Sequence, residues 1–287
     1  MFKNTIDGIV YRLKEERSLD FLSKYGKAFC VFDENDSGNL SFGFEGGDRR
    51  YFVKIAGLKT ISSSVLGDAA ISNLIHAVKV YEDIRHPNLI QLIEHYAHDD
   101  LYIAVFKWVD GDCLFDHWNF EKYAKDKTLV SPLDRFQKLP LEKRLISFDI
   151  LLSFMKTVAE CGYAAIDLYD GSLMYDFLHD RLTICDIDLF AKAPYRNTMG
   201  RMWGSSRFMS PEEYRLGACI DEITNVFNLG ALSFVFFGDD RSKTLESWTA
   251  GKPLYEVARH AMNPERDKRY QSIWEFISNW NKAKSIS

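Results

Sequence analysis

The feature that most constrains this chain is a run of three short blocks in a fixed order between residues 162 and 213, the first two carrying aspartates and the third glycine and proline. The blocks read GYAAIDLYDGSLMYD, LTICDIDLF and GRMWGSSRFMSPEE. The linking segment SLMYDFLHDRLTIC has an apolar run, a polar turn and a second apolar run, which is typical of a β-hairpin. The pattern therefore predicts a hairpin between two aspartates, Asp167 and Asp186.

In this order and spacing the blocks resemble the catalytic half of a protein kinase. That family has a catalytic loop H-R-D-L-x-x-x-N, a metal-binding D-F-G and a closing A-P-E. On this chain Asp167 matches the catalytic-loop aspartate, Asp186 matches the metal-binding aspartate, and residues 210–212 match A-P-E. The resemblance implies that Asp167 is the base for an attacking hydroxyl and that Asp186 binds magnesium.

Several positions of these blocks depart from the family pattern. Ala165 and Ile166 replace the catalytic-loop His and Arg, Ser172 replaces the Asn, and Asp188 replaces the Gly of D-F-G. Ser172, as a substitute metal ligand, offers a hydroxyl in place of an amide carbonyl, so magnesium affinity is expected to fall. Asp188 follows Asp186 by two residues, and in extended chain both carboxylates face one ion. A solvated or turn-capping role for Asp188 is the alternative.

The first third of the chain carries residues that resemble the nucleotide-binding half of the same family. Lys54 in YFVKIA resembles the strand lysine that holds the α- and β-phosphates of ATP. Gly38 and Leu40 match the last glycine of the phosphate-covering loop and the apolar residue after it. Lys107 and Val109 lie in KWVDG, the expected hinge between lobes, and are expected to contact the nucleotide.

The phosphate-covering loop also departs from the pattern. Asp33 and Asn35 stand where the family has its first two glycines, and Glu34 and Asp36 add negative charge. Backbone contact with phosphate needs the freedom of glycine and tolerates nearby carboxylates poorly. The helix glutamate that holds the lysine in active kinases falls at Ala77. A plain hairpin turn without nucleotide contact is therefore an open alternative.

The chain is expected to adopt an α+β, bilobal fold. Strands are predicted over 28–33, 39–45 and 49–56, two more in LIQLIEHYAHDDLYIAVFKW, and a helix over 69–84. We expect an N-terminal extension (1–20), an N-lobe (21–107) with a five-stranded antiparallel sheet and one helix, and a mainly helical C-lobe (108–287). The predicted buried stripe of the N-lobe helix consists of Ile71, Leu74, Ile75, Val78 and Tyr81.

The last third of the chain adds three further matches. GSSRFMSPEE is close to the G-T-x-x-Y-M-A-P-E of protein kinases, with Ser205 for the threonine that steadies the catalytic loop. NVFNLG resembles D-V-W-S-L-G, with Asn225 for the aspartate, and NPERDKRYQS resembles the closing D-P-x-x-R segment. The resemblance implies a structural ion pair between Arg269 and Glu212.

The amino-acid composition limits the classes of partner and the compartment that we expect for this chain. Thirty-six Lys and Arg against 41 Asp and Glu give a net charge of −5 without a basic run, so nucleic acid is not expected. Five scattered cysteines without a C-x-x-C pair indicate reduced thiols and no zinc site. The longest apolar run, LGALSFVFFG, is too short to span a membrane. We expect a cytoplasmic protein with no membrane partner.

The predicted function is that of a phosphotransferase resembling bacterial serine/threonine protein kinases, which transfers the γ-phosphate of ATP, with Mg, to a hydroxyl of a protein substrate. The resemblance covers residues 21–282. A pseudokinase that serves as a binding or scaffold module is one alternative. A small-molecule phosphotransferase is another, because Asp170 and Gly171 resemble part of the D-L-H-x-G-N of that class.

Overall fold

The structure is a computed structural model that describes residues 1–34, 37–116, 119–126 and 128–286. Two positions of the expected phosphate-covering loop, Asn35 and Asp36, lie outside these described residues. The chain divides into two compact units, the first formed by residues 1–83 and 90–109 and the second by residues 84–89 and 110 onward. The two units are described separately.

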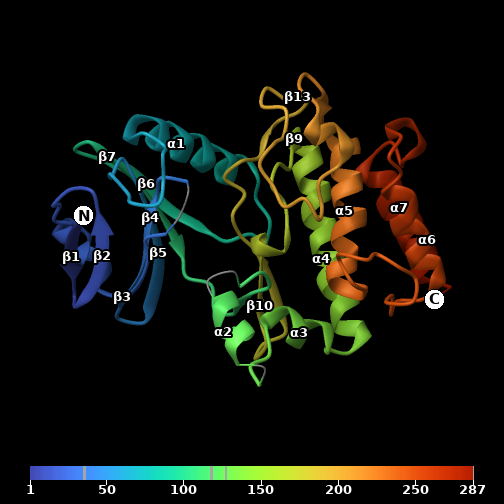
Figure 1. Cartoon of the computed structure of the whole chain (residues 1–287), viewed down its shortest axis with the longest axis horizontal. Coiled ribbons are helices and arrows are strands. Elements are labelled where there is room, and N and C mark those ends of the chain that lie inside the picture. The colour runs from blue at the N-terminus through green and yellow to red at the C-terminus, as the bar shows by residue number, and fades with distance from the viewer. Residues whose placement is uncertain (35–36, 117–118, 127, 287) are drawn as a thin grey trace. The chain divides into compact units, whose positions relative to one another are not determined.

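The first unit is built around a five-stranded antiparallel sheet of order β3-β4-β5-β7-β6 (Figure 1). This sheet, together with helix α1, confirms the expected N-lobe architecture. A separate two-stranded hairpin precedes the sheet. The elements are β1 (Phe2–Ile6), β2 (Ile9–Leu13), the 3-10 helix η1 (Asp20–Tyr25), β3 (Lys27–Phe32), β4 (Leu40–Gly46), β5 (Arg49–Ala56), α1 (Gly67–Asp83), β6 (Leu92–His98) and β7 (Leu101–Lys107).

Both faces of the sheet are covered, as its aromatic and β-branched strands require. Val53 and Ile55 of β5 are fully buried in one core cluster with Tyr11 and Leu13 of the N-terminal hairpin. Alternate residues of a strand point to opposite faces, so the even-numbered residues of β5 face the other side. There Tyr81 of α1 packs edge-on against the sheet, with its ring centroid 4.8 Å from that of Phe106.

Helix α1 contacts β5, β6 and β7 through a stripe that differs from the predicted one. Leu74, Val78 and Tyr81 are buried as expected, but Ile75 is 47% exposed. Ala77 is buried in its place, only 1% exposed. The buried stripe of the helix is therefore centred on Ala77 and not on Ile75.

The second unit is mainly helical, as expected for the C-lobe. Helices α4 and α5 lie side by side (Figure 1). Phe148 of α4 contacts Phe236 and Phe237 of α5. The helices are α2 (Phe120–Lys125), α3 (Pro132–Gln137), α4 (Leu141–Glu160), α5 (Glu222–Phe237), α6 (Lys252–Ala261) and α7 (Ile273–Lys284), with 3-10 helices η3 (Asp170–Ser172), η4 (Pro211–Tyr214) and η5 (Arg266–Lys268).

Short strands of the second unit position the motif blocks. The strands are β8 (Asp112–Cys113), β9 (Tyr163–Ala164), β10 (Leu173–Asp176), β11 (Arg181–Ile184), β12 (Ala191–Lys192), β13 (Tyr195–Arg196) and β14 (Cys219–Ile220). Strands β10 and β11 pair in antiparallel fashion, which confirms the hairpin predicted between Asp167 and Asp186. Among the described residues, no helix is long and apolar enough to cross a bilayer.

Candidate functional site

The two motif aspartates share an unusual backbone conformation. Asp167 has φ of 62° and Asp186 has φ of 52°, in the left-handed region that non-glycine residues rarely enter. Other aspartates with positive φ, such as Asp7 and Asp180, lie in the turns of hairpins, where this conformation is common. Asp167 and Asp186 lie in no such turn. Backbone strain of this kind is concentrated at functional sites.

Asn225 holds the chain just before Asp167. Its Nδ2 donates to the carbonyl oxygen of Ala165 at 2.8 Å, and its Oδ1 accepts from the amide of Ala165, also at 2.8 Å. Nδ2 also donates to Oδ1 of Asn228, whose own amide donates to the Glu213 carboxylate at 2.9 Å. These groups are buried. A satisfied buried network of this kind fixes the backbone that carries Asp167.

The activation segment, residues 191–209, passes directly beside Asp167. A Cβ placed on Gly204 would lie 3.6 Å from Oδ1 of Asp167, so the chain at Gly204 approaches the carboxylate closely. Ile166, at the position of the family's arginine, is 6% exposed in an apolar cluster with Met202 and Met209 of the segment. Apolar packing therefore occupies the place where that arginine would bind a phosphate.

Ser172 is fully buried, and its Oγ has no hydrogen-bond partner within the part of the chain that the structure describes. The amide of Cys185 donates to the Ser172 carbonyl at 2.8 Å, so Ser172 lies directly across the hairpin from the residue before Asp186. Asp186 is exposed and Asp188 is half-buried. A buried hydroxyl without a partner is an oxygen donor of the kind that a divalent cation such as magnesium accepts.

The described residues contain no cluster of three His, Cys, Asp or Glu side chains able to hold a metal by themselves. This finding does not oppose magnesium binding, because magnesium is often held by one or two carboxylates and completes its coordination with substrate phosphates and water.

Tyr169, two residues after Asp167, packs closely against Gly171. Its ring is so close to Gly171 that a Cβ on Gly171 would stand 2.2 Å from Tyr169 Cε2. Burial raises the pKa of the Tyr169 hydroxyl, and the charges of Asp186 and Asp167 add to this effect. Glycine at 171 is thus required for packing against Tyr169, which gives the Asp-Gly pair a structural role.

The ion pair predicted between Arg269 and Glu212 is confirmed. Arg269 Nη1 and Nη2 donate to the two carboxylate oxygens of Glu212 at 2.6 and 2.9 Å, and both residues are buried. Although burial acts in the opposite direction, Arg269 lowers the pKa of Glu212. This pair fixes η4, which follows the activation segment, to the loop before α7.

Lys54 lies in the first unit, on the central strand β5 and half-buried. It stands opposite Ser41 of β4 and Ala104 of β7. Because directly opposed residues of antiparallel strands point to the same face, Lys54, Ser41 and Ala104 share the face that α1 covers.

Leu40 of β4, the predicted apolar residue after Gly38, does not share that face. Its register partner is Ile55, and Leu40 is fully buried in the core cluster beneath the N-terminal hairpin. A shift of one residue moves a strand side chain to the other face. Ser41, the next residue of β4, was not singled out by the motif and occupies the position beside Lys54.

The loop between β3 and β4 is held by its neighbours in the first unit. Arg12 Nε donates to Oδ2 of Asp33 at 3.0 Å, and Arg12 also bonds Glu34. Gly38 has φ of 82°, and a Cβ on it would lie 3.2 Å from the Cβ atoms of Val65 and Ala70. The negative charge expected to repel phosphate is therefore partly compensated, while the backbone at Gly38 is packed against apolar side chains.

The remaining first-unit candidates are placed as follows. Ala77, at the position of the family's helix glutamate, is buried; the nearest following carboxylate on α1, Glu82, accepts from Nε2 of His95 of β6 at 3.3 Å. Lys107 ends β7 with an exposed side chain, and Val109 is half-buried as the last residue of the first unit.

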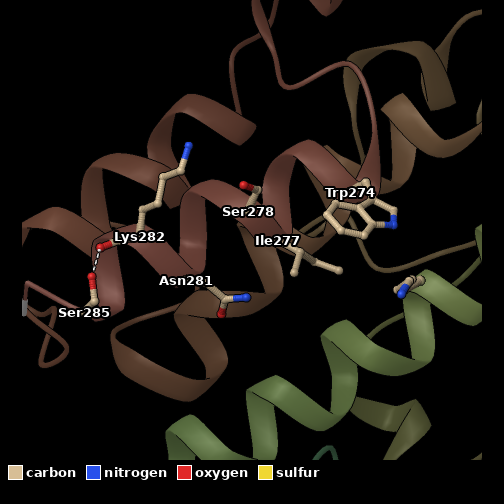
Figure 2. A pocket seen from close by; sticks show the side chains of 7 residues that line it. Trp274, Ile277, Ser278, Asn281, Lys282 and Ser285 are labelled. Atoms are coloured by element: carbon tan, nitrogen blue, oxygen red, sulfur yellow. Dashed lines mark hydrogen bonds between the residues drawn. The ribbon is translucent and has the colours of Figure 1, made fainter.

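A surface hollow of about 510 Å³ lies along α7 and contains none of the motif residues (Figure 2). Trp274 on its rim is 63% exposed, with Lys156 of α4 above its ring at 5.2 Å. The lining residues are Lys156, Trp274, Ile277, Ser278, Asn281, Lys282 and Ser285. The hollow lacks carboxylates, so the motif region is the better candidate for chemistry.

Comparison with known proteins gives a structural match. No protein-family profile matches the sequence. No curated protein matches it either. The structure is similar to that of the Cydia pomonella granulovirus kinase PK-1, with a TM-score of 0.65, 15% sequence identity, and coverage of 91% of this chain and 95% of that chain. Because the matched kinase is viral, the comparison gives no support to a bacterial relationship. The chain has the bilobal protein-kinase fold, with a five-stranded antiparallel sheet and α1 in one unit and a mainly helical second unit.

Proposed function

We propose that this protein is an ATP-dependent phosphotransferase of the serine/threonine protein-kinase type. It transfers the γ-phosphate of ATP to the hydroxyl of a protein substrate. The fold supports phosphotransfer in general, and the residues at the motif positions support the specific roles given below.

Asp167 is proposed to accept the proton of the attacking hydroxyl, or to orient that hydroxyl. Lys54 is proposed to bind the α- and β-phosphates, as the strand lysine does in kinases. Gly38, Lys107 and Val109 are proposed to contact the nucleotide through backbone and apolar groups.

Asp186, Ser172 and Asp188 are proposed to hold magnesium. The ion would neutralise phosphate charge when bound. Ser172 Oγ supports this assignment, because it is buried and lacks a hydrogen-bond partner among the described residues.

One observation carries the proposal more than any other. The carboxylate of Asp167 lies beside Gly204 of the activation segment, on a backbone that Asn225 holds by two 2.8 Å hydrogen bonds. A chain that had lost phosphotransfer would have no need of a left-handed aspartate at this position, since that conformation costs of order 1–3 kcal/mol.

A protein acceptor is favoured over a small molecule by the same region. Asp170, which resembles part of the small-molecule motif, is engaged in a bidentate ion pair with Arg207 of the activation segment. That segment, with its GSSRFMSPEE sequence, is an element that small-molecule phosphotransferases lack. The five cysteines form no disulfide among the described residues, which supports a reducing compartment such as the cytoplasm.

The second candidate is a pseudokinase that binds or scaffolds without catalysis. Two observations in the first unit favour it. Ala77 offers no carboxylate on the face of α1 that packs on the sheet, and the backbone at Gly38 is packed against Val65 and Ala70. Both features weaken the expected hold on a nucleotide.

A thermal-shift titration with ATP and magnesium, followed by mass spectrometry for phosphate transfer, tests the proposal. We expect a weak ATP-induced shift that Lys54→Ala and Asp186→Asn abolish. Lys282→Ala, in the hollow of Figure 2, and Asp99→Asn, in the exposed β6–β7 turn, are matched controls that should leave the shift unchanged.

Asp167→Asn separates the two candidates. For an enzyme it should keep ATP binding and lower the rate of transfer by roughly 10²–10⁴-fold. ATP binding without any transfer by the wild type would favour the binding module. An ATP shift that survives Lys54→Ala and Asp186→Asn but is lost in Lys282→Ala would place the nucleotide elsewhere and refute the site assignment.

A further inference from the structure

The catalytic loop and the activation segment are joined by an ion pair that no motif of the sequence indicates. Arg207 Nη1 donates to Oδ2 of Asp170 at 2.8 Å, and Nη2 donates to Oδ1 at 2.7 Å. Asp170 follows Asp167 by three residues, and Arg207 follows Gly204 by three. The pair therefore links the two segments a second time, three residues beyond the point where Gly204 approaches the Asp167 carboxylate.

The surroundings of the pair make it a fixed contact. Asp170 is fully buried, and the Arg207 side chain is 19% exposed. Arg207 Nε donates to Oγ of Ser205 at 3.1 Å, and Nη1 also bonds Asp240 in the loop after α5. Burial raises the pKa of Asp170, and the guanidinium opposes that rise. Because Asp170 accepts two parallel bonds and Ser205 and Asp240 accept others, the planar guanidinium of Arg207 is held in one orientation.

Aromatic packing adds to this hold. The guanidinium carbon of Arg207 lies 4.7 Å from the ring centroid of Phe115 and 4.6 Å from that of Phe208. Nearby, Ile166 packs against Met202 and Met209. The activation segment is thus fastened to the catalytic loop by an ion pair and by an apolar cluster, without a phosphate.

The signs of these charges are the reverse of a phosphate-activated arrangement. A phosphorylated segment brings negative charge and needs a cation on the catalytic loop. Here the cation, Arg207, is on the segment, the anion, Asp170, is on the loop, and the candidate phosphate-binding position is Ile166. An isoleucine makes no charge-assisted hydrogen bond.

We propose that Arg207 is a positioning residue. Its pair with Asp170 holds the activation segment against the catalytic loop in the unphosphorylated chain, and this contact fixes the position of the Asp167 carboxylate. This inference rests on the proposed function. It predicts that the activity of the protein does not depend on phosphorylation of its activation segment.

The test uses the full chain and two separate readouts. Arg207→Gln and Asp170→Asn remove the charge from either side of the pair with little change in shape, and the double variant removes both. Arg207→Lys keeps the charge and loses the planar fork. Arg215→Gln is the matched control, because Arg215 is exposed and lies only eight residues further along the chain.

The first readout is steady-state phosphate transfer by phosphatase-treated protein. We expect Arg207→Gln and Asp170→Asn each to lower kcat at least tenfold with KM for ATP within twofold. Arg207→Lys should recover part of the loss. The double variant should be no worse than the poorer single variant, since the residues act as one unit. Equal kcat in wild type and both single variants would overturn the inference.

The second readout, hydrogen exchange of residues 199–209 followed by mass spectrometry, does not depend on activity. We expect faster exchange in Arg207→Gln and Asp170→Asn and wild-type exchange in Arg215→Gln. If the wild type transfers no phosphate, the proposed function fails. Hydrogen exchange alone then decides whether the Arg207–Asp170 pair holds the activation segment. Unchanged exchange in both single variants would overturn the inference, whether or not the protein is an enzyme.

Discussion

Asn225 binds Ala165 in both directions, donating to its carbonyl oxygen and accepting from its amide at 2.8 Å each. The family motif has an aspartate at position 225, which accepts but cannot donate when it is ionised. This chain therefore uses an amide for a bond that the family's residue is unable to make.

Restoring the family's aspartate should damage the protein. Asn225→Asp would place a buried carboxylate against the Ala165 carbonyl and the Asn228 side-chain oxygen, so we expect a loss of about 1–3 kcal/mol in the free energy of unfolding. Urea denaturation measures this loss. Asn73→Asp, at an exposed position of α1, is the control that should be nearly neutral. An Asn225→Asp variant as stable as the wild type would refute the two-way bond.

The Arg269–Glu212 pair gives a prediction about pH. Arg269 lowers the pKa of Glu212 against the effect of burial, so the pair's contribution is complete above the unfolded carboxyl pKa of about 4.3 and is lost as the pH falls through the folded pKa. Glu212→Gln should cost roughly 3–5 kcal/mol at pH 7. This cost should shrink as the pH is lowered below about 4.

Glu213, the next residue, provides a control because its carboxyl pKa is shifted in the opposite direction. Burial raises the pKa of Glu213, so its ionised form is disfavoured in the folded state. The stability of the wild type relative to Glu213→Gln should therefore fall as the pH rises above about 4.3. The stability relative to Glu212→Gln should instead rise with pH below about 4.3 and stay level above it. Unfolding measured from pH 3.5 to 7 tests both slopes. Parallel slopes would contradict the assignment of the two carboxyl groups.

Arg12 should have a small effect on nucleotide affinity. Its bonds to Asp33 and Glu34 compensate negative charge in the loop before Gly38. The Arg12 side chain is 38% exposed, and an exposed pair contributes about 0.2–1 kcal/mol, so Arg12→Gln should weaken ATP binding by no more than about fivefold. Salt should mask the effect. Arg17→Gln, which breaks a pair with Asp100, is the control that should not change ATP affinity. A larger loss for Arg17→Gln would count against this role.

Phosphorylation of the activation segment should not activate this protein. Thr198 and Ser206 are exposed, and the nearest catalytic-loop position for reading a phosphate is the buried Ile166. Thr198→Glu and Ser206→Ala should therefore leave kcat within twofold of the wild type. Ser205→Ala should lower it, because the Ser205 hydroxyl accepts a bond from Arg207. A gain in kcat for Thr198→Glu, measured on phosphatase-treated protein, would show that a cation reads the phosphate after all.

The parts of the fold that sequence predicts are those set by local patterns. The aromatic, alternating segments gave β3, β4 and β5, and the apolar–turn–apolar segment gave the β10–β11 hairpin, because strand period and turn composition act over a few residues. The Arg269–Glu212 pair was predictable because both residues belong to motifs of fixed spacing.

The parts that sequence misses depend on register and on distant contacts. The motif spacing selects Leu40 but does not give its face: the pairing of β4 with β5 puts Leu40 opposite Ile55 and Ser41 opposite Lys54, and a shift of one residue decides the face. Ile75 was assigned to the core, but the buried stripe of α1 is centred on Ala77. The pairs Arg12–Asp33 and Arg207–Asp170 join residues 21 and 37 positions apart and follow no motif.

Asp188 is predicted to take over part of the metal-binding role vacated at Ser172. Two carboxylates that converge on a divalent ion neutralise it more fully than one carboxylate and a hydroxyl, and without the ion they repel each other. Asp188→Gly restores the family's D-F-G glycine, and Asp188→Asn keeps an oxygen donor without the charge. If Asp188 is a ligand, magnesium-dependent ATP binding should weaken in the order wild type, Asp188→Asn, Asp188→Gly. If Asp188 is only an obstructing charge, both variants should bind more tightly than wild type, because removing the carboxylate also removes its repulsion of the phosphates. Calorimetric titration with ATP at several magnesium concentrations distinguishes the two cases, and tighter binding by Asp188→Gly would refute the metal-binding role.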